Sequence, residues 1–296
     1  MGSDKIKIFL GDSLKRWLLT SLKNGDFDAV ADSFGKYFDK RATQDFMHAF
    51  GALSDKLNFD DKHKDMILKA LLHAHYLHTE QWRKFENKPY ISHILRVSSY
   101  FANWLSENNT VLESHDIDKI SYALLACLLH DSVEDQADRL HQSADRDKAL
   151  AVVENQYGEQ VRHYLNCLSK PEIDEDDEKT EKYKEWIKGI WESGDMLLIM
   201  IKFSDIYDNL RSSIDTFVSQ DPSSLFSKSL DAAQIEVIDR AEKWIMKYKD
   251  ALEALQEVYS EDMYRGAHAE VLQGAQDRAK SILEKAEKAL VLPRVK

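Results

Sequence analysis

Glycine and proline are scarce in this chain, with 10 and 4 among 296 residues. Neither the G-x-G-x-x-G motif nor the G-x-x-x-x-G-K-[ST] motif occurs, so the sequence excludes a Rossmann dinucleotide fold and a P-loop nucleotide site. Few chain breakers and 43% hydrophobic residues instead indicate a helical globular protein. The length suits one large domain or two small ones.

Cysteine is rarer still, and long apolar runs are missing. Cys127 and Cys167 are too few for a disulfide framework or a zinc-finger set, and both lie in apolar helical segments, where we expect them to be buried. No apolar run approaches the roughly 20 residues that a membrane-spanning helix needs. The first residues lack the hydrophobic segment of a signal peptide. We therefore expect a cytoplasmic protein with no membrane partner.

Basic residues are also in the minority, with 40 Lys and Arg against 52 Asp and Glu and a net charge of −12. Binding along a nucleic acid needs an excess of basic side chains, so we expect no nucleic-acid partner. Seven of the acids lie in the run 172–182, which is interpreted as a solvated loop or helix start. A lid over an active site is the alternative for this run.

The apolar residues recur with helical spacing nearly everywhere. This spacing predicts helices over 12–24, 27–39, 43–57, 61–82, 90–107, 117–131, 145–157, 159–169, 180–191, 196–218, 229–258 and 262–290. Asp12 and Thr43 are expected to be N-caps, and Asn24-Gly25 is expected to end the first helix. Pro89 suits the first turn of the helix over 90–107. No strand pattern, repeat or linker is evident, so the fold class is all-α.

A dense polar cluster ends the strongly apolar helix predicted over 117–131. It reads His130-Asp131-Ser132-Val133-Glu134-Asp135. His130 and Asp131 are metal-ligand types, and the paired carboxylates of Glu134 and Asp135 could hold or activate a water molecule. If the helix continues, Glu134 shares a face with His130.

A second polar cluster lies inside the apolar helix predicted over 196–218. Asp205, Asn209 and Ser212 are spaced i, i+4 and i+7, which places them on one face. Burying such groups is costly unless they are paired or bind a metal. Lys202, one turn before Asp205, could neutralise it or meet a phosphate.

The third cluster is a basic loop, residues 82–89, that leads into a helix carrying His93 in its first turn. Helix N-termini favour anions, and the bases add positive charge beside this one. Trp82 and Tyr90 flank the loop; packing in the core is the favoured interpretation, with stacking on a base as the alternative.

Two histidines and two aspartates from the three clusters make an N2O2 set that suits Mn, Fe or Zn.

The order His…His-Asp…Asp resembles that of the HD-domain metal phosphohydrolases. The flanking patterns R-K-x(4)-P-Y-I-x-H, L-L-H-D-x-V-E-D, Y-G-x-x-V and I-K-x-x-D-x-x-x-N-L-R are similar to the hydrolase domain of the RelA/SpoT family. The architecture is most similar to that of the stand-alone small alarmone hydrolases of the metazoan SpoT homologue type. The resemblance covers roughly residues 65–215.

This resemblance implies an all-α HD fold with extra N- and C-terminal helices and one bound Mn²⁺, with Fe or Zn as alternatives. The implied metal ligands are His93, His130, Asp131 and Asp205. The implied catalytic residues are Glu134 and Asp135, which place and activate the attacking water, and Asn209, which lies near the ribose. The implied and expected substrate contacts are Arg83, Lys84, Lys88, Tyr90, Lys202, Arg211 and Ser212.

Two departures from the family pattern concern the substrate. Phe85 stands where many members carry a small polar residue, in a loop one residue longer than that of the long bifunctional enzymes. The usual A-D-R-L-H-N is Ser204-Asp205-Ile206-Tyr207-Asp208-Asn209 here, which keeps the aspartate and the asparagine. His73, His75 and His78 precede the loop; solvated or hydrogen-bonded histidines are favoured over a metal pair.

The resemblance implies a guanosine-3′,5′-bis(diphosphate) 3′-pyrophosphohydrolase. It would hydrolyse ppGpp or pppGpp to GDP or GTP and pyrophosphate with metal-activated water, as part of the stringent response. Two alternatives stay open. The same chemistry could act on an adenosine alarmone or on NADPH, or the protein could be a nucleotide-sensing or toxin-neutralising partner of an alarmone synthetase.

The predicted organisation is an N-terminal helical extension over 1–60, the hydrolase domain over 61–220 and a C-terminal helical hairpin over 221–296. The hairpin either packs on the domain or extends it. A homo-oligomer could form through these C-terminal helices. The expected partner is a small-molecule nucleotide.

Overall fold

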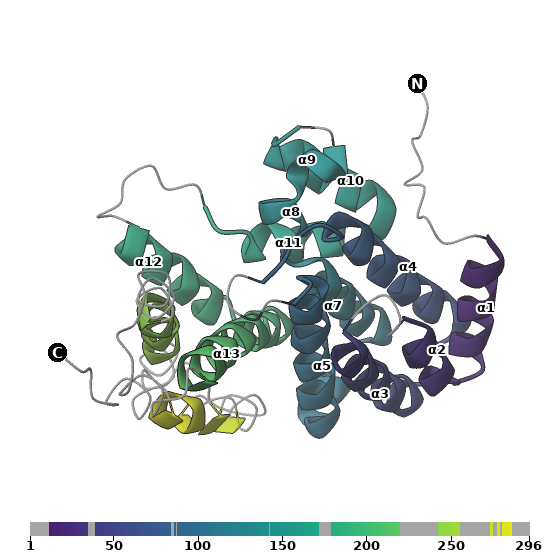
Figure 1. Cartoon of the computed structure of the whole chain (residues 1–296), viewed down its shortest axis with the longest axis horizontal. Coiled ribbons are helices and arrows are strands. Elements are labelled where there is room, and N and C mark those ends of the chain that lie inside the picture. Colours follow the sequence, from purple (N-terminus) through teal and green to yellow (C-terminus); the bar gives the residue numbers. More distant parts are fainter. Residues whose placement is uncertain are drawn as a thin grey trace. The chain divides into compact units, whose positions relative to one another are not determined.

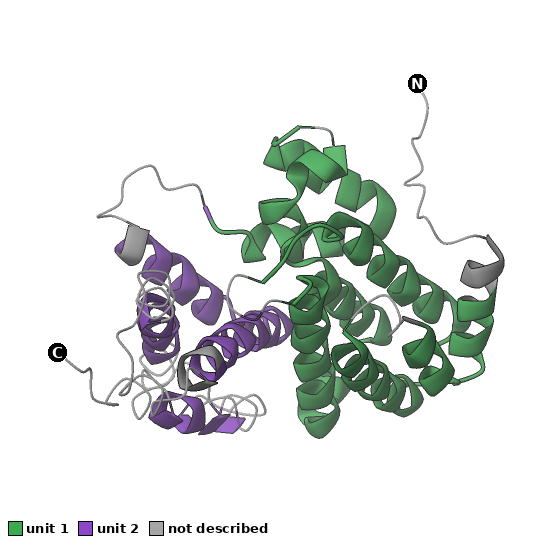
Figure 2. Ribbon diagram, viewed as in Figure 1, with its two compact units in different colours: residues 1–83, 88–170 green, residues 84–87, 171–296 purple. Residues whose placement is uncertain are grey.

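The computed structural model divides the chain into two compact units (Figures 1 and 2). Unit 1 comprises residues 1–83 and 88–170, and unit 2 comprises residues 84–87 and 171–296. The residues that the structure describes are 12–34, 39–83, 86, 88–141, 143–171, 179–219, 242–254, 273–274, 277–278 and 280–285.

Helices make up the regular structure of the described residues, and the one pairing outside them is an isolated bridge between Trp82 and Pro89. The all-α fold class is therefore confirmed. The helices of unit 1 are α1 Asp12–Lys23, α2 Phe27–Phe34, α3 Lys40–Leu57, α4 Asp61–Leu77, α5 Ile91–Glu107, α6 Asn109–Ser114, α7 Ile117–Leu129, α8 Ser132–Asp135, α9 Ala137–His141, α10 Arg146–Tyr157 and α11 Glu159–Leu168. The short helices α6, α8 and α9 have no counterpart in the sequence prediction.

Capping side chains start several helices of unit 1. Asp60, Asp116 and Asp145 each accept a hydrogen bond from a backbone N–H three residues further on, at the starts of α4, α7 and α10. The predicted break at Asn24-Gly25 is confirmed, because α1 ends at Lys23 and Gly25 has a φ of 74°.

Four predictions about helix ends are wrong. Thr43 lies inside α3, where its hydroxyl donates to the Asp39 carbonyl oxygen, and Asp39 is the cap instead. The helix predicted over 61–82 ends at Leu77, and Pro89 lies before α5 rather than in its first turn. The helix predicted over 117–131 ends at Leu129, so His130 and Glu134 do not belong to one continuous helix.

Helix α7 is the centre of unit 1. It packs against α4, α5 and α11, and its residues from Ile120 to Leu129 are almost all buried, Cys127 among them. Burial of apolar side chains on most sides of a helix contributes the largest favourable term in folding. The burial predicted for this helix is confirmed, and the polar residues after Leu129 therefore lie at the end of a rigid core helix.

The N-terminal helices pack within the same unit. Helix α3 packs extensively against α5 and also contacts α2. A row of aromatic rings continues this contact, with Phe27 edge-on to Phe50, and with Phe46 and Phe59 also beside Phe50. Helices α2 and α3 thus share a packed core with α5, the helix that carries His93. The three domains predicted from the sequence remain a prediction.

Unit 2 contains α12 Lys179–Glu192, α13 Met196–Ser219 and a further helical segment over 242–254. Helix α12 packs on α13, and the indole N–H of Trp191 donates to the Ala251 carbonyl oxygen at 3.2 Å. Most of the acidic run 172–182 and most of the predicted helices 229–258 and 262–290 lie outside the described residues.

Among the residues described, no helix combines the length and the apolar character that crossing a membrane requires.

Candidate metal centre

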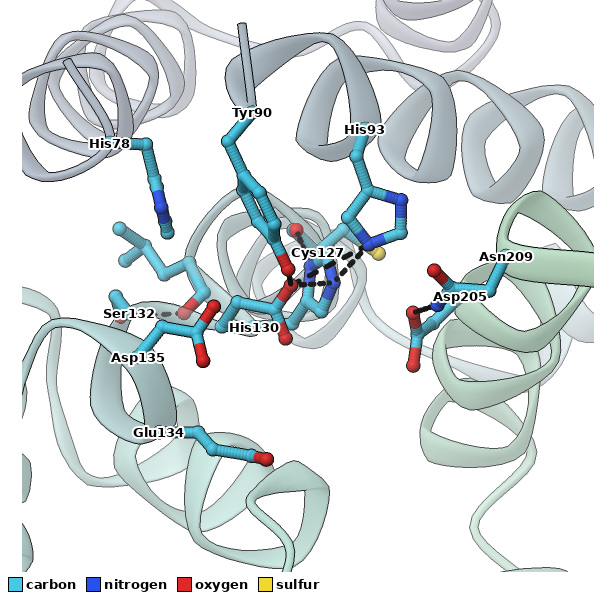
Figure 3. Close-up of polar contacts among 12 residues, drawn as sticks. His78, Tyr90, His93, Cys127, His130, Ser132, Glu134, Asp135, Asp205 and Asn209 are labelled. Carbon is cyan, nitrogen blue, oxygen red and sulfur yellow. Dashed lines mark hydrogen bonds and ion pairs between the residues drawn. The ribbon is translucent and has the colours of Figure 1, made fainter. Parts of the chain in front are cut away.

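Two histidines and an aspartate converge in unit 1. His130 and Asp131 form the turn between α7 and α8, and His93 lies in the first turn of α5. The Nε2 atoms of His93 and His130 are 3.3 Å apart, and Asp131 Oδ2 lies 3.1 Å from His130 Nε2 and 3.5 Å from His93 Nε2. Figure 3 shows the side chains of His93 and His130 in this cluster, with dashed lines marking their contacts. The spacing suits three ligands of one cation, since each offers an atom within 4.8 Å of the others.

The environment of His130 selects the form that binds metals. Its Nδ1 lies 2.8 Å from the Cys127 carbonyl oxygen, which can only accept, so Nδ1 carries the proton. In the neutral ring Nε2 then has a free lone pair, directed at the cluster. A backbone carbonyl that orients a ligand histidine in this way is typical of metal sites.

Asp131 is held as a carboxylate. Burial works to raise its pKa, but His130 and His93, when their rings are protonated, outweigh burial through their charges and hydrogen bonds and lower the pKa well below the usual range. The Tyr90 hydroxyl donates to Asp131 Oδ2 at 2.6 Å. The oxygen that faces both histidines is therefore charged and oriented.

Tyr90 belongs to a stack beside the cluster. Its ring lies parallel to that of His78 with centroids 5.0 Å apart, and the Arg83 guanidinium lies 5.6 Å from the Tyr90 ring centroid. Burial, with the charges of Asp131 and Asp135, raises the Tyr90 pKa well above 10, so the hydroxyl keeps its proton and acts as a donor. The role seen in the structure is orientation of Asp131; contact with a substrate remains a prediction.

Glu134 and Asp135, the predicted water-activating pair, lie on the short helix α8 and are both exposed. Asp135 Oδ2 accepts a hydrogen bond from Gln81 Nε2 at 2.7 Å, and Glu134 Oε2 accepts one from the Lys170 backbone N–H at 3.1 Å. Loss of water around the carboxyl and the negative charge of Asp131 raise the Asp135 pKa to about 6. A carboxylate with that pKa can take up a proton near neutral pH.

The predicted residues on α13 form a cluster of their own in unit 2. Lys202 Nζ and Asn209 Nδ2 donate to the two oxygens of Asp205 at 2.8 and 2.6 Å, and Figure 3 shows Asp205 and Asn209 turned toward one another. The helical spacing predicted this face. Of the two roles left open for Lys202, the structure shows the pairing with Asp205, and contact with a phosphate remains a prediction. Ser212 is buried on the same helix, and the exposed Arg211 lies 3.7 Å from Asp215.

Two basic side chains of the loop are less available for a substrate than the sequence suggested. Arg83 is buried, and its backbone N–H donates to the Lys88 carbonyl oxygen. The Lys88 ammonium pairs with Asp39 at 3.3 Å. Lys84 lies outside the described residues. Packing of Trp82 in the core was the wrong expectation, because its side chain is 58% exposed.

Two of the three histidines that precede the basic loop, His73 on α4 and His78 in the turn after it, are hydrogen-bonded. His73 Nδ1 lies 3.1 Å from the Tyr157 hydroxyl, and His78 Nδ1 lies 2.5 Å from Gln81 Oε1. Burial lowers the pKa of both histidines to about 4, so both are neutral at pH 7. Sequence reasoning missed Gln81, because nothing in the local pattern marks a contact with Asp135.

The solved structures that are similar to this chain include a metazoan ortholog of SpoT that hydrolyzes ppGpp and plays a role in starvation responses. The two chains are 20% identical, the TM-score is 0.43, and the match covers 77% of this chain and 97% of the other. No protein-family model and no curated protein matches the chain.

Proposed function

We propose that this protein is a metal-dependent phosphohydrolase that removes the 3′-pyrophosphate of ppGpp and pppGpp by attack of water. The observation that carries the proposal is the convergence of His93, His130 and Asp131, with His130 in the metal-binding tautomer and Asp131 ionised. The motifs around these residues supply the substrate class. ppGpp is also the nucleotide that the similar metazoan protein hydrolyzes.

The donor set fits one divalent cation. His93, His130 and Asp131 would hold it, with Asp205 as a fourth ligand on the basis of the sequence resemblance. Two imidazoles with carboxylates suit Mn, Fe or Zn, and Mn²⁺ is our choice from that resemblance. When bound, such a cation lowers the pKa of its water and stabilises negative charge on phosphoryl oxygens.

The protein's own carboxylates would handle the proton. Asp135, whose pKa is raised to about 6, would accept it from the attacking water, with Glu134 as the second member of the pair. General bases work best when their pKa lies near the working pH. No covalent enzyme intermediate is needed, since phosphoryl transfer depends mainly on positioning and charge stabilisation.

Basic side chains would bind the substrate phosphates and base. From the resemblance, Arg83 and Lys84 would contact the nucleotide and Asn209 would lie near the ribose. Lys88, Tyr90, Lys202, Arg211 and Ser212 complete the proposed contacts. Lys202 and Lys88 are paired with carboxylates in this structure, so a polyanionic substrate would compete with those pairs. A cytoplasmic location and a homo-oligomer also remain predictions.

The test is a turnover assay with ppGpp and Mn²⁺. We expect GDP and pyrophosphate from the wild type and none from Asp131→Ala, while the matched control Asp138→Ala, on the neighbouring helix α9, keeps full activity. Equal inactivity of the wild type and Asp131→Ala would refute the proposal. Parallel assays with adenosine alarmones and NADPH decide the nucleotide. Growth rescue from a toxic synthetase that survives Asp131→Ala would favour the binding partner over the enzyme.

A further inference from the structure

Gln81 contacts both the proposed base, Asp135, and Tyr90, the residue that orients Asp131. Its side chain reaches Asp135, the proposed base, through the 2.7 Å hydrogen bond from Nε2 to Oδ2. Its backbone carbonyl accepts the Tyr90 backbone N–H at 2.8 Å, and Tyr90 in turn orients the metal ligand Asp131. One residue of the loop after α4 is therefore bonded to both the base and the residue that orients the ligand.

The amide of Gln81 has only one consistent orientation. A carboxylate can only accept, so the Gln81 NH2 group faces Asp135 and Oε1 faces away from it. Oε1 receives Gln136 Nε2 at 2.9 Å and lies 2.5 Å from His78 Nδ1. His78 must therefore donate from Nδ1, which leaves its Nε2 without a proton in the neutral ring.

His78 makes this arrangement rigid. Its side chain is 1% exposed, its ring stacks on Tyr90, and its Nε2 has no hydrogen-bond partner among the described residues. Turning this buried ring would break its hydrogen bond to Gln81 and leave a further polar atom unpaired, which is costly in a buried site. The amide of Gln81 is thus held from one side by His78 and Gln136 and points its N–H groups at Asp135.

We infer that Gln81 is a positioning residue that holds the Asp135 carboxylate in the orientation for accepting the proton of the attacking water. This inference rests on the proposed hydrolysis. Gln81 donates to Oδ2, and no described residue donates to Asp135 Oδ1, so Oδ1 is the oxygen left to face water. Removing a group that orients a catalytic side chain costs rate without changing substrate affinity.

The experiment compares Gln81→Met with Gln81→Asn, whose amide is one methylene too short to reach Asp135, and with the control Thr79→Val. The Thr79 hydroxyl donates only to backbone carbonyls of α4, so its loss leaves Gln81 untouched. We expect both Gln81 variants to lower kcat by about 10- to 100-fold, the range seen when outer-shell partners are removed. KM for ppGpp and bound Mn²⁺ should stay at the values of the wild type and of Thr79→Val.

A double-mutant cycle with Asp135→Asn, measured in single turnovers with enzyme in excess, tests whether Gln81 acts through Asp135. In that background Gln81→Met should change the rate less than about twofold, because coupled residues are not additive. If Gln81→Met lowered the rate in the Asp135→Asn background as much as in the wild type, the inference would be overturned. An unchanged kcat in Gln81→Met, or a fall in kcat explained by lost Mn²⁺, would also overturn it.

A readout that needs no turnover separates this inference from the proposed function. Long-range ¹H–¹⁵N spectra of the His78 ring should show the Nδ1–H tautomer in the wild type and a tautomer mixture in Gln81→Met. A wild type without hydrolase activity refutes the proposed function, whatever the tautomer is. An active wild type whose rate is indifferent to Gln81 refutes only the positioning role.

Discussion

The hydrogen bond from Tyr90 to Asp131 makes a sharp prediction about metal affinity. Tyr90→Phe removes only the hydroxyl and keeps the ring that stacks on His78 and lies beside Arg83. Without this donor, Oδ2 of Asp131 loses its 2.6 Å contact and part of its fixed orientation toward His93 and His130. We therefore expect weaker binding of Mn²⁺ with little change in fold.

The magnitude follows from the kind of hydrogen bond. A hydrogen bond to a charged group contributes about 1.5–3 kcal/mol, and 1.4 kcal/mol corresponds to a factor of ten in affinity. The hydroxyl also stabilises the carboxylate before the metal binds, so the full value is an upper limit. The expected rise in Kd for Mn²⁺ is about tenfold, with about 100-fold as the maximum, in line with other outer-shell substitutions.

Titration calorimetry with Mn²⁺ measures this effect directly, and Tyr157→Phe is the matched control. Tyr157 is a buried tyrosine that also pairs with a histidine, His73, but it does not touch the cluster. A tenfold weaker Kd should also reduce the stabilisation by saturating Mn²⁺ by about 1.4 kcal/mol in thermal unfolding. If Tyr90→Phe bound Mn²⁺ within twofold of the wild type, the reasoning about Asp131 would be refuted.

Three further predictions concern pH and the backbone. Hydrolysis should slow as pH falls through about 6, because protonated Asp135 cannot act as a base. A rate that is flat from pH 7 to 5 would contradict the assignment. In the folded state the pKa of the buried His73 is lowered to about 4. Its contribution to the free energy of unfolding is therefore fully present above pH 6.5 and is lost as pH falls toward 4. The free energy of unfolding should therefore drop by about 2 kcal/mol from pH 7 to 5 through this residue alone, and urea titrations of His73→Phe should lack that share. Gly189→Ala should raise stability by about 0.5–1 kcal/mol, since the added methyl lies in helix α12 and meets no atom within 4 Å. Gly51→Ala should lower stability by about 1–3 kcal/mol, because its Cβ would lie 2.8 Å from the Phe27 ring. The two variants should shift the melting temperature in opposite directions.

Local sequence patterns predicted most of the helices but placed some helix ends wrongly. Apolar spacing located α7 because burial on most sides leaves a long unbroken run of hydrophobic residues. The same spacing could not show that α7 stops at Leu129, since the polar residues that follow are compatible with a helix. Asp39 and Thr43 are both good capping residues, and only the folded chain shows that Asp39 fills the role.

The sequence by itself determined the helical fold class and the identity of the candidate ligand residues, because His-Asp pairs and helical spacing are local properties of the chain. Tertiary structure decided which of those groups meet. The contact of Gln81 with Asp135 joins residues 54 positions apart, and that of Tyr90 with Asp131 joins residues 41 apart. Such contacts depend on how α4, α5 and α7 pack, and packing sums many weak long-range interactions that no short pattern contains.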